Sequence, residues 1–390
     1  ERLQRLDQAM AEKVGSQQLA GAVTLLARHG KIVNFSTHGQ QDIANAVTMK
    51  KDSIFRIYSM TKPITSVAMM ILYEEGKWLP NEPIAKYLPE FNDIKVYAGQ
   101  DQKGKPILAA PEHPPTIGEL LTHTAGIGLG FFDTPVDKMY ANANMWGSGS
   151  LKEFVEKIAH IPLKYQPGET WEYSLSADVA GYLVERLSGQ SLAQFFEERI
   201  FKPLGMQDTA FFVPTQKLSR LALIYQPEGN SLAALPRDPN ITALPALLSG
   251  GGGLYSTAED YFRFAQMLLN EGKFNGVQLL SPSSVKLMRA NHLPEKLQNG
   301  KHGIGLYHMQ PGFGFGYNLG VFVDPQKVGS TAGAGTYLWD GLAGTWFWID
   351  PANDVIFIGM IQRWGLAPGM PNLEDMSRAL VYQALISPDK

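Results

Sequence analysis

Residues 54–70 read IFRIYSMTKPITSVAMM, and the interpretation of the whole chain starts from this stretch. Residues 53–57 form a short run that is typical of a β-strand. From Ser59 onward the segment is the most apolar helical one in the chain, and we expect this helix to end near Gly76. A helix that is apolar on all sides lies buried inside its protein. The sequence therefore predicts a central helix that begins close to Ser59.

Segments with the pattern of β-strands lie at both ends of the chain. Near the N-terminus, an amphipathic helix precedes two apolar runs that flank residues 29–31, which is typical of a β-hairpin. Near the C-terminus, three apolar runs separated by turns predict an antiparallel meander, at residues 335–341, 344–350 and 354–362. A final helix is expected over residues 372–386.

The middle of the chain has a different pattern, with short helices separated by loops rich in Gly and Pro. We therefore predict an α+β fold. Its central antiparallel sheet is built from the N- and C-terminal segments and flanked by helices, with a mainly helical region inserted between them. The expected bounds are residues 1–78 and 300–390 for the sheet region, and 79–299 for the inserted region. A cleft between two such regions is a common place for a ligand site.

The composition excludes several classes of protein. Of the 390 residues, 44% are hydrophobic and only 18% are charged, which is typical of a globular chain and not of a disordered one. The net charge of −3 provides no field that would attract nucleic acid. Because cysteine is absent, the chain has no disulfide, no thiolate metal site and no cysteine nucleophile.

No apolar run reaches the ~18 residues of a membrane span. The N-terminal segment is charged and lacks the apolar core of a secretion signal, which favours a cytoplasmic location. A periplasmic or secreted location stays open, because the sequence starts at Glu1 and not at Met. The sequence leaves the oligomeric state open.

Ser59 and Lys62 have the spacing of a nucleophile and its base. Residues three apart lie on one face of a helix, so the Lys62 amine can reach the Ser59 hydroxyl. A serine is a weak nucleophile until a neighbouring base takes its proton. The N-terminus of a helix disfavours a cation, and so does burial, and both effects favour the neutral, basic form of Lys62.

The Ser-x-x-Lys pattern occurs three times, and the context distinguishes the occurrences. Ser283 follows a proline and opens a helix with polar flanks, which predicts a helix cap at Ser283 and an exposed Lys286. Ser387 and Lys390 lie in the last four residues. Only Ser59 opens an apolar helix.

Three further features could belong to a site, although each alone is typical of ordinary structure. Tyr173 follows a turn at residues 167–169. Trp339 and Gly341 lie on a predicted aromatic strand, where a glycine could let a ligand approach. Residues 249–253, SGGGG, form a flexible or tightly turning loop, but no Gly-Lys-Ser/Thr follows, so a phosphate-binding P-loop is not expected.

In this order along the chain, Ser59-x-x-Lys62, Tyr173 and Trp339-x-Gly341 resemble the motifs of the serine β-lactamase and penicillin-binding-protein superfamily. The resemblance is strongest to family VIII carboxylesterases, the esterase relatives of class C β-lactamases. It extends over nearly the whole chain and includes IGELLTHTAGIG (117–128), PGETWEYSLSADVAGYLVERLSG (167–189) and GTWFWIDPANDVIF (344–357).

The resemblance implies a role for each catalytic residue. Ser59 would be the acylated nucleophile, and Lys62 and Tyr173 would share the work of general base and acid. The backbone N–H groups of Ser59 and Leu342 would form the oxyanion hole. The resemblance therefore implies a serine hydrolase that forms an acyl-enzyme and uses neither a cofactor nor a metal.

Two departures from the family pattern concern the substrate. Trp339 stands where β-lactamases have the lysine of Lys-Thr-Gly, and Leu175 stands where they usually have the asparagine of Tyr-x-Asn. Without that lysine an anionic substrate loses a charge-assisted hydrogen bond worth roughly 1.5–3 kcal/mol. We therefore expect neutral carboxylic esters and not penicillins. Five aromatic residues could line a crowded cleft that suits short acyl groups: Phe131, Phe132, Tyr140, Trp146 and Trp339.

Several alternatives stay open or can be set aside. A β-lactamase, a D-Ala-D-Ala peptidase, an acyltransferase and an amidase would use the same catalytic groups. An α/β-hydrolase would need a Gly-x-Ser-x-Gly elbow, which the chain lacks. The eight histidines form no His-Glu-x-x-His motif, so we expect a structural His123 near a helix end and no effect of EDTA. A non-catalytic protein with this fold would normally have lost Ser59 or Lys62.

Overall fold

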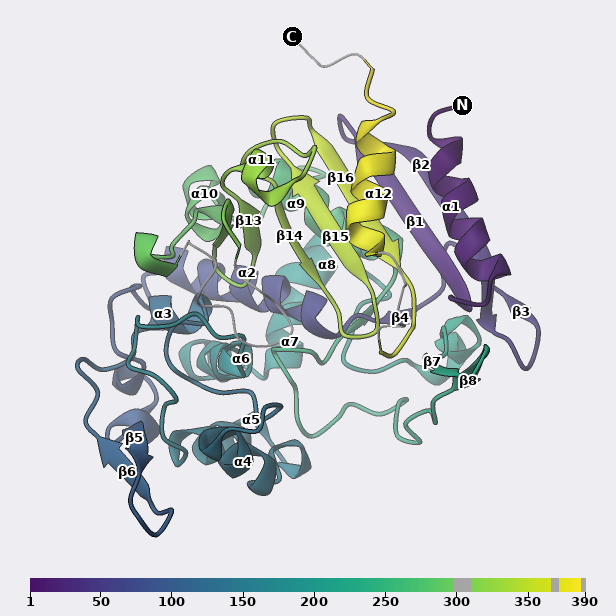
Figure 1. Ribbon diagram of the computed structural model, residues 1–390. Helices are drawn as coiled ribbons and strands as arrows, with labels where there is room; N and C mark the ends of the chain where they lie inside the picture. Colours follow the sequence, from purple (N-terminus) through teal and green to yellow (C-terminus); the bar gives the residue numbers. More distant parts are fainter. Residues whose placement is uncertain (298–309, 366–371, 387–390) are drawn as a thin grey trace.

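The structure is a computed structural model that describes residues 1–297, 310–365 and 372–386. Within these residues, an eight-stranded antiparallel sheet forms the centre, with the order β12-β13-β14-β15-β16-β1-β2-β3 (Figure 1). Its strands are β12 Phe313–Phe315, β13 Gly320–Phe322, β14 Tyr337–Asp340, β15 Trp346–Asp350, β16 Val355–Met360, β1 Gly21–Arg28, β2 Lys31–Asp42 and β3 Val47–Thr48. The predicted hairpin and the predicted meander thus meet where β16 pairs with β1, and the predicted α+β fold is confirmed.

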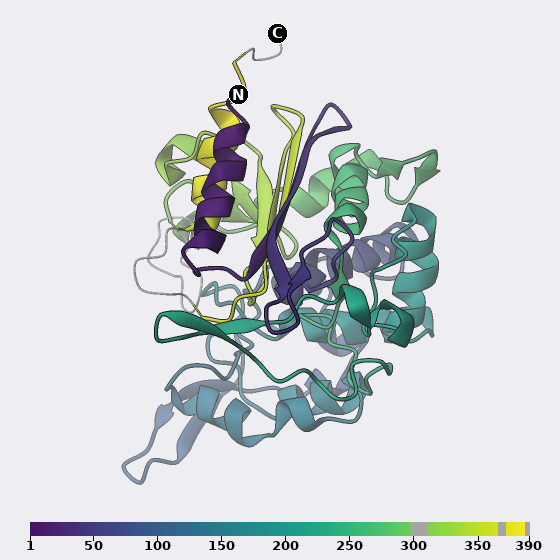
Figure 2. The ribbon, with the colours of Figure 1, turned by 90° about the vertical axis from the view of Figure 1, so that its right-hand side faces the viewer.

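Helices cover both faces of the sheet (Figure 2). On one face, α1 Gln4–Gly15 and α12 Leu373–Tyr382 lie side by side over the indole rings of Trp346 and Trp348. On the other face, α9 Ala258–Leu269 packs against β16, β1 and β15. Because both faces are buried, β15 is apolar at nearly every position instead of alternating. The helix α9 belongs to the predicted inserted region, residues 79–299, yet it packs on the sheet. The division into a sheet region and an inserted region therefore stays a prediction.

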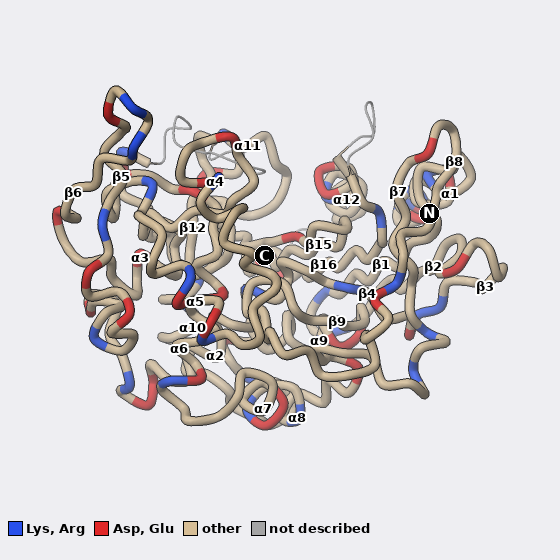
Figure 3. Tube along the Cα trace, turned by 90° about the horizontal axis from the view of Figure 1, so that it is seen from below, with Lys and Arg blue, Asp and Glu red and all other residues tan. Residues whose placement is uncertain are grey.

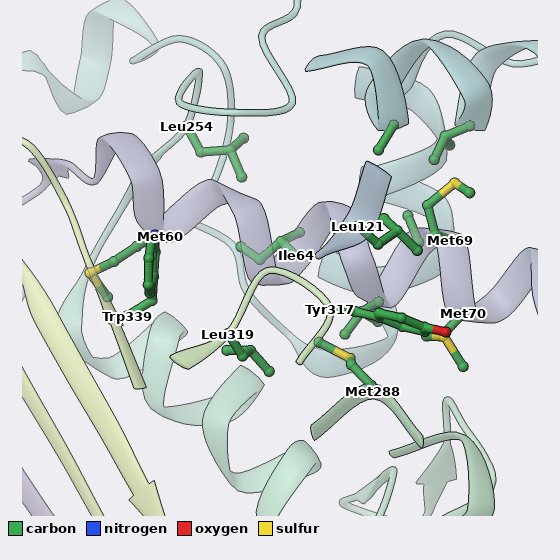
Figure 4. Close-up of a cluster of buried hydrophobic side chains, with 14 of the residues drawn as sticks. Met60, Ile64, Met69, Met70, Leu121, Leu254, Met288, Tyr317, Leu319 and Trp339 are labelled. Atoms are coloured by element: carbon green, nitrogen blue, oxygen red, sulfur yellow. The ribbon is translucent and has the colours of Figure 1, made fainter. Parts of the chain in front are cut away.

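The predicted central helix is α2 Thr61–Glu74, and every residue from Thr61 to Leu72 is buried. The helix α6 Ser176–Ser188 packs along it. Figure 4 shows apolar side chains around α2, with Met60 and Trp339 near one end of the view and Met70 near the other. The α-helix begins two residues later than Ser59, because Tyr58–Met60 form a 3-10 turn in front of it.

The remaining helices and small sheets surround this core. The helices are α3 Ile117–Leu121, α4 Pro135–Asn142, α5 Leu151–Ala159, α7 Leu192–Phe196, α8 Lys202–Leu204, α10 Pro282–Arg289 and α11 Pro325–Val328. The paired strands are β4 Phe55–Arg56 with β9 Tyr255–Ser256, β5 Val96–Gln100 with β6 Pro106–Ala109, β7 Tyr225–Glu228 with β8 Ser231–Ala234, and β10 Lys273–Phe274 with β11 Val277–Gln278.

The predicted helix cap at Ser283 is wrong. The residue that caps α10 is Ser281, whose hydroxyl accepts from the Ser284 N–H at 3.2 Å. The cap precedes Ser283 because Pro282 occupies the first helical position, where its missing N–H costs nothing. Lys286 is exposed, as predicted. The third Ser-x-x-Lys pattern, at residues 387–390, lies outside the described residues.

Charged residues of both signs are spread over the fold. Lys and Arg are interspersed with Asp and Glu along the Cα trace, in agreement with the small net charge (Figure 3). Among the described residues, no helix is both long enough and apolar enough to cross a membrane.

Candidate active site

The structure brings Ser59, Lys62 and Tyr173 together. Ser59 lies in the 3-10 turn, Lys62 lies in the first turn of α2, and Tyr173 lies in the segment just before α6. The Lys62 Nζ is 3.2 Å from the Ser59 Oγ, and the Tyr173 hydroxyl is 2.6 Å from the same oxygen. The Lys62 Nζ also lies 4.6 Å from the centre of the Tyr173 ring. The Ser59 hydroxyl therefore has two neighbours that can exchange a proton with it.

The backbone in front of Ser59 is strained. Tyr58 has a φ of +41°, in the left-handed region that disfavours residues with a Cβ by roughly 1–2 kcal/mol. This conformation turns the chain sharply between β4 and α2, and the pairing of β4 with β9 anchors one side of the turn. Strain of this kind is concentrated at functional sites. No pattern in the sequence indicates it, since tyrosine rarely adopts this conformation.

Lys62 is held by the glycine-rich loop. Its Nζ donates to the Gly251 carbonyl oxygen at 2.6 Å. The Gly251 N–H and the Ser249 hydroxyl both donate to Asp178 Oδ1, at 3.1 and 2.6 Å. A Cβ on Gly251 would lie 2.5 Å from Asp178 Oδ2, which explains the glycine at this position. Burial raises the pKa of the Asp178 carboxyl, and the Lys62 cation opposes this rise.

Tyr173 is held between two aromatic rings. The ring of His123 lies 5.1 Å from the Tyr173 ring, and the ring of Trp339 lies 5.7 Å from it. The His123 Nδ1 accepts from the Ser174 N–H at 3.2 Å. Burial, together with the nearby Lys62 cation, lowers the pKa of His123 to about 3, so the ring is neutral at ordinary pH. His123 lies just after α3, near a helix end as expected.

Trp339, Gly341 and Leu342 are placed differently from one another. Trp339 is buried behind Tyr173 and does not line the cavity beside Ser59. A Cβ on Gly341 would lie 2.4 Å from the Ile57 carbonyl oxygen, so this glycine lets the end of β14 approach the segment before Ser59. The close approach is thus made by the protein's own backbone and not by a ligand. Leu342 follows and lines the cavity.

A cavity of about 830 Å³ opens beside Ser59, and most of its wall is apolar. Of the five aromatic residues expected there, Phe131 and Trp146 line it, whereas Phe132, Tyr140 and Trp339 do not. The sequence analysis missed other lining residues, because nothing in their local pattern distinguishes them. Among them are Arg56, Tyr58, Asp238, Asn240, Ile241, Tyr255, Trp364 and the segment 243–247. Within the described ranges, no group of three or more His, Asp or Glu side chains is arranged to hold a metal ion.

The model of the family described as Beta-lactamase matches residues 6–379. The chain belongs to the beta-lactamase family. Esterase EstB of Burkholderia gladioli is 30% identical to this beta-lactamase-family protein over 377 residues, which cover 89% of this chain and 87% of EstB. Protein Rv1367c of Mycobacterium tuberculosis is 37% identical over 353 residues, with 88% and 86% of the two chains covered.

A solved structure of another protein has the same fold as this member of the beta-lactamase family. It is EstCE1, described as a hydrolase with promiscuous acyltransferase activity, and it superposes with a TM-score of 0.81. The two chains are 24% identical, and the match covers 98% of each. The resemblance to family VIII esterases is confirmed by the family match and by EstB. The protein is a serine hydrolase of the β-lactamase and penicillin-binding-protein superfamily.

Proposed function

We propose that the protein is a carboxylesterase that cleaves neutral carboxylic esters through an acyl-enzyme on Ser59. The observation that supports this most directly is the position of the Ser59 hydroxyl. It lies within hydrogen-bond distance of both the Lys62 amine and the Tyr173 hydroxyl, beside an open, largely apolar cavity. The identity with Esterase EstB supports the same function.

In the first step, the Ser59 Oγ attacks the ester carbonyl carbon while its proton passes to the Lys62–Tyr173 pair. Both groups lie within hydrogen-bond distance of the Ser59 Oγ, and we treat them as one proton-accepting pair. The carbonyl π electrons move to the oxygen, which becomes an oxyanion. The backbone N–H groups of Ser59 and Leu342 would stabilise this oxyanion, and each such donor is worth about 3–4 kcal/mol.

In the second step, the oxyanion re-forms the carbonyl and the bond to the alcohol oxygen breaks. The leaving alkoxide takes the proton from the Lys62–Tyr173 pair and departs as the alcohol, leaving the acyl group on Ser59. Water then attacks the acyl carbon and gives a proton to the same pair. When the second tetrahedral intermediate collapses, the proton returns to the Ser59 oxygen and the carboxylic acid is released.

The preference for neutral esters follows from the groups around the reacting oxygen. Leu175 lines the cavity with an apolar side chain, and Trp339 offers no cation to a carboxylate. A penicillin would therefore lose the partners of both its amide and its carboxylate. Short acyl groups are proposed as the preferred acids.

A substrate panel tests the proposal. We expect p-nitrophenyl acetate or butyrate to be hydrolysed with a kcat/KM well above that for nitrocefin, with Ser59→Ala as the inactive control. A fluorophosphonate probe should add its mass to the peptide that contains Ser59. A higher kcat/KM for nitrocefin would assign the protein to the β-lactamases, and a wild type that neither turns over esters nor reacts with the probe would exclude an acyl-enzyme.

A further inference from the structure

Large apolar side chains that reach solvent gather at the mouth of the cavity. Phe131, Trp146 and Leu244 are 56%, 57% and 53% exposed, and all three line the cavity that contains Ser59. Large apolar residues that gather in one exposed patch usually mark a surface that binds something. The patch is continuous with the reacting centre, so its ligand is a part of the substrate.

Trp146 is fixed in its exposed position by the turn that contains it. The 3-10 turn Met145–Gly147 is anchored by the buried Met145. On either side of the turn, the Lys157 Nζ donates to the Asn144 carbonyl oxygen at 3.1 Å and to the Ser148 hydroxyl at 2.9 Å. The indole also packs on the ring of Phe154, with 5.3 Å between the ring centres. The turn therefore holds the indole at the cavity.

Phe131 is connected to the segment of Tyr173 through a buried lysine. The N–H of Gly130, next to Phe131, donates to Asp137 Oδ1 at 2.9 Å. The Lys164 Nζ lies 2.7 Å from Asp137 Oδ2 and forms a second ion pair with Glu172, the neighbour of Tyr173. All three charged side chains are buried. One cation thus holds the loop of Phe131 beside the segment of Tyr173.

A second contact places the same wall next to Tyr173. The Leu175 N–H donates to the Gly128 carbonyl oxygen at 3.1 Å, so Gly128 lies beside Leu175, two residues from Tyr173. Leu129 and Leu175 line the cavity together with Phe131 and Trp146. These four residues form what we call the Tyr173-side wall.

We propose that the Tyr173-side wall binds the alcohol part of the ester, and that the alcohol is a large apolar one. This inference rests on the proposed esterase function. The leaving alkoxide must take its proton from the Lys62–Tyr173 pair, so the alcohol lies on the side of Tyr173. The cavity of about 830 Å³ is within the range that accommodates drug-sized ligands, and it exceeds what a simple short-chain alkyl ester fills.

Two acetates with alkanol leaving groups, ethyl acetate and decahydronaphthyl acetate, test the inference. We expect the wild type to have a kcat/KM for the decahydronaphthyl ester at least about tenfold above that for ethyl acetate. Trp146→Ala and Phe131→Ala should each lower the value for the bulky ester about tenfold more than the value for ethyl acetate. Leu108→Ala, a truncation of a similarly exposed leucine on β6, should change neither value.

Each of the other outcomes is informative. Equal losses on the two acetates, or no loss on either, would overturn the inference, while turnover of ethyl acetate would leave the esterase function standing. If the two variants lose more kcat/KM on ethyl decanoate than on ethyl butyrate, the wall binds the acyl part of the ester instead. Absence of all ester turnover, without labelling of Ser59, would overturn the proposed function itself. Thermal midpoints near that of the wild type would show that the variants are folded.

Discussion

The Lys62 Nζ lies closer to the carbonyl oxygen of Gly251 than to the hydroxyl of Ser59, at 2.6 Å against 3.2 Å. Because Gly251 is itself bound by Asp178, the amine is anchored to α6 through a backbone group 189 residues further along the chain. Asp178 thus acts on Lys62 through Gly251, as a positioning residue. The loop SGGGG thus positions the Lys62 amine.

Replacing Asp178 tests this anchor. Asp178→Ala leaves two buried donors without an acceptor, which we expect to cost about 1–3 kcal/mol each in the free energy of unfolding. The displaced Gly251 should also release Lys62 and lower kcat by about ten- to a hundredfold, with a smaller change in KM. Asp178→Asn keeps an acceptor oxygen and should recover most of the activity. If the asparagine variant is as impaired as the alanine variant, the charge of Asp178 matters more than its hydrogen bonds.

Removing either proton-transfer group should nearly abolish catalysis. We expect Lys62→Met and Tyr173→Phe each to lower kcat/KM by about 10²–10⁴-fold. For Lys62→Met the thermal midpoint should stay near that of the wild type. Lys286→Met is the matched control, because Lys286 also follows a serine by three residues but is exposed. Substantial turnover by Lys62→Met would contradict the role proposed for the amine.

Gly341 should be intolerant of a side chain. In Gly341→Ala the added Cβ would meet the Ile57 carbonyl oxygen and the Thr345 Oγ1, both at 2.4 Å. We expect β14 to shift away from the Ser59 turn, with a loss of about 1–3 kcal/mol of stability and a lower kcat. Gly15→Ala is the control, since nothing lies within 4 Å of a Cβ there. Rates and urea-unfolding curves measure both effects, and a fully active Gly341→Ala would show that this approach is not needed.

His123 should make the protein sensitive to acid. Burial depresses the pKa of His123 to about 3, from 6.5, so between these values the unfolded chain binds a proton that the folded protein does not. Stability therefore falls as the pH falls through this window, by about 2 kcal/mol between pH 7.5 and pH 5. His123→Asn should lose less stability over the same interval, and asparagine tolerates the φ of +57° at this position.

Urea unfolding at the two pH values measures the difference for wild type and variant. His160→Asn, at an exposed position, should keep the pH dependence of the wild type. An unchanged dependence in His123→Asn would mean that other groups cause the acid sensitivity.

Local patterns predicted the elements but not the contacts between them. The hairpin of β1 and β2, the meander and the buried α2 follow from apolar runs and turns that lie close together in the chain. The left-handed Tyr58 and the bond from Lys62 to Gly251 depend on packing between distant segments, which no local pattern encodes. For the same reason the placement of Trp339 behind Tyr173 could not be predicted, because burial of a ring depends on what covers it.

The pairing of β1 with β16 has a consequence for biosynthesis. Arg28 pairs with Val355, and Val23 with Met360, so one edge of the first strand has no partner until almost the whole chain has been made. At about 5–20 residues per second, that delay lasts roughly 20–70 s on the ribosome. During this time the nascent hairpin presents an apolar, unpaired edge to other chains. The yield of native protein in a host should therefore rise with slower initiation, lower temperature and greater chaperone capacity.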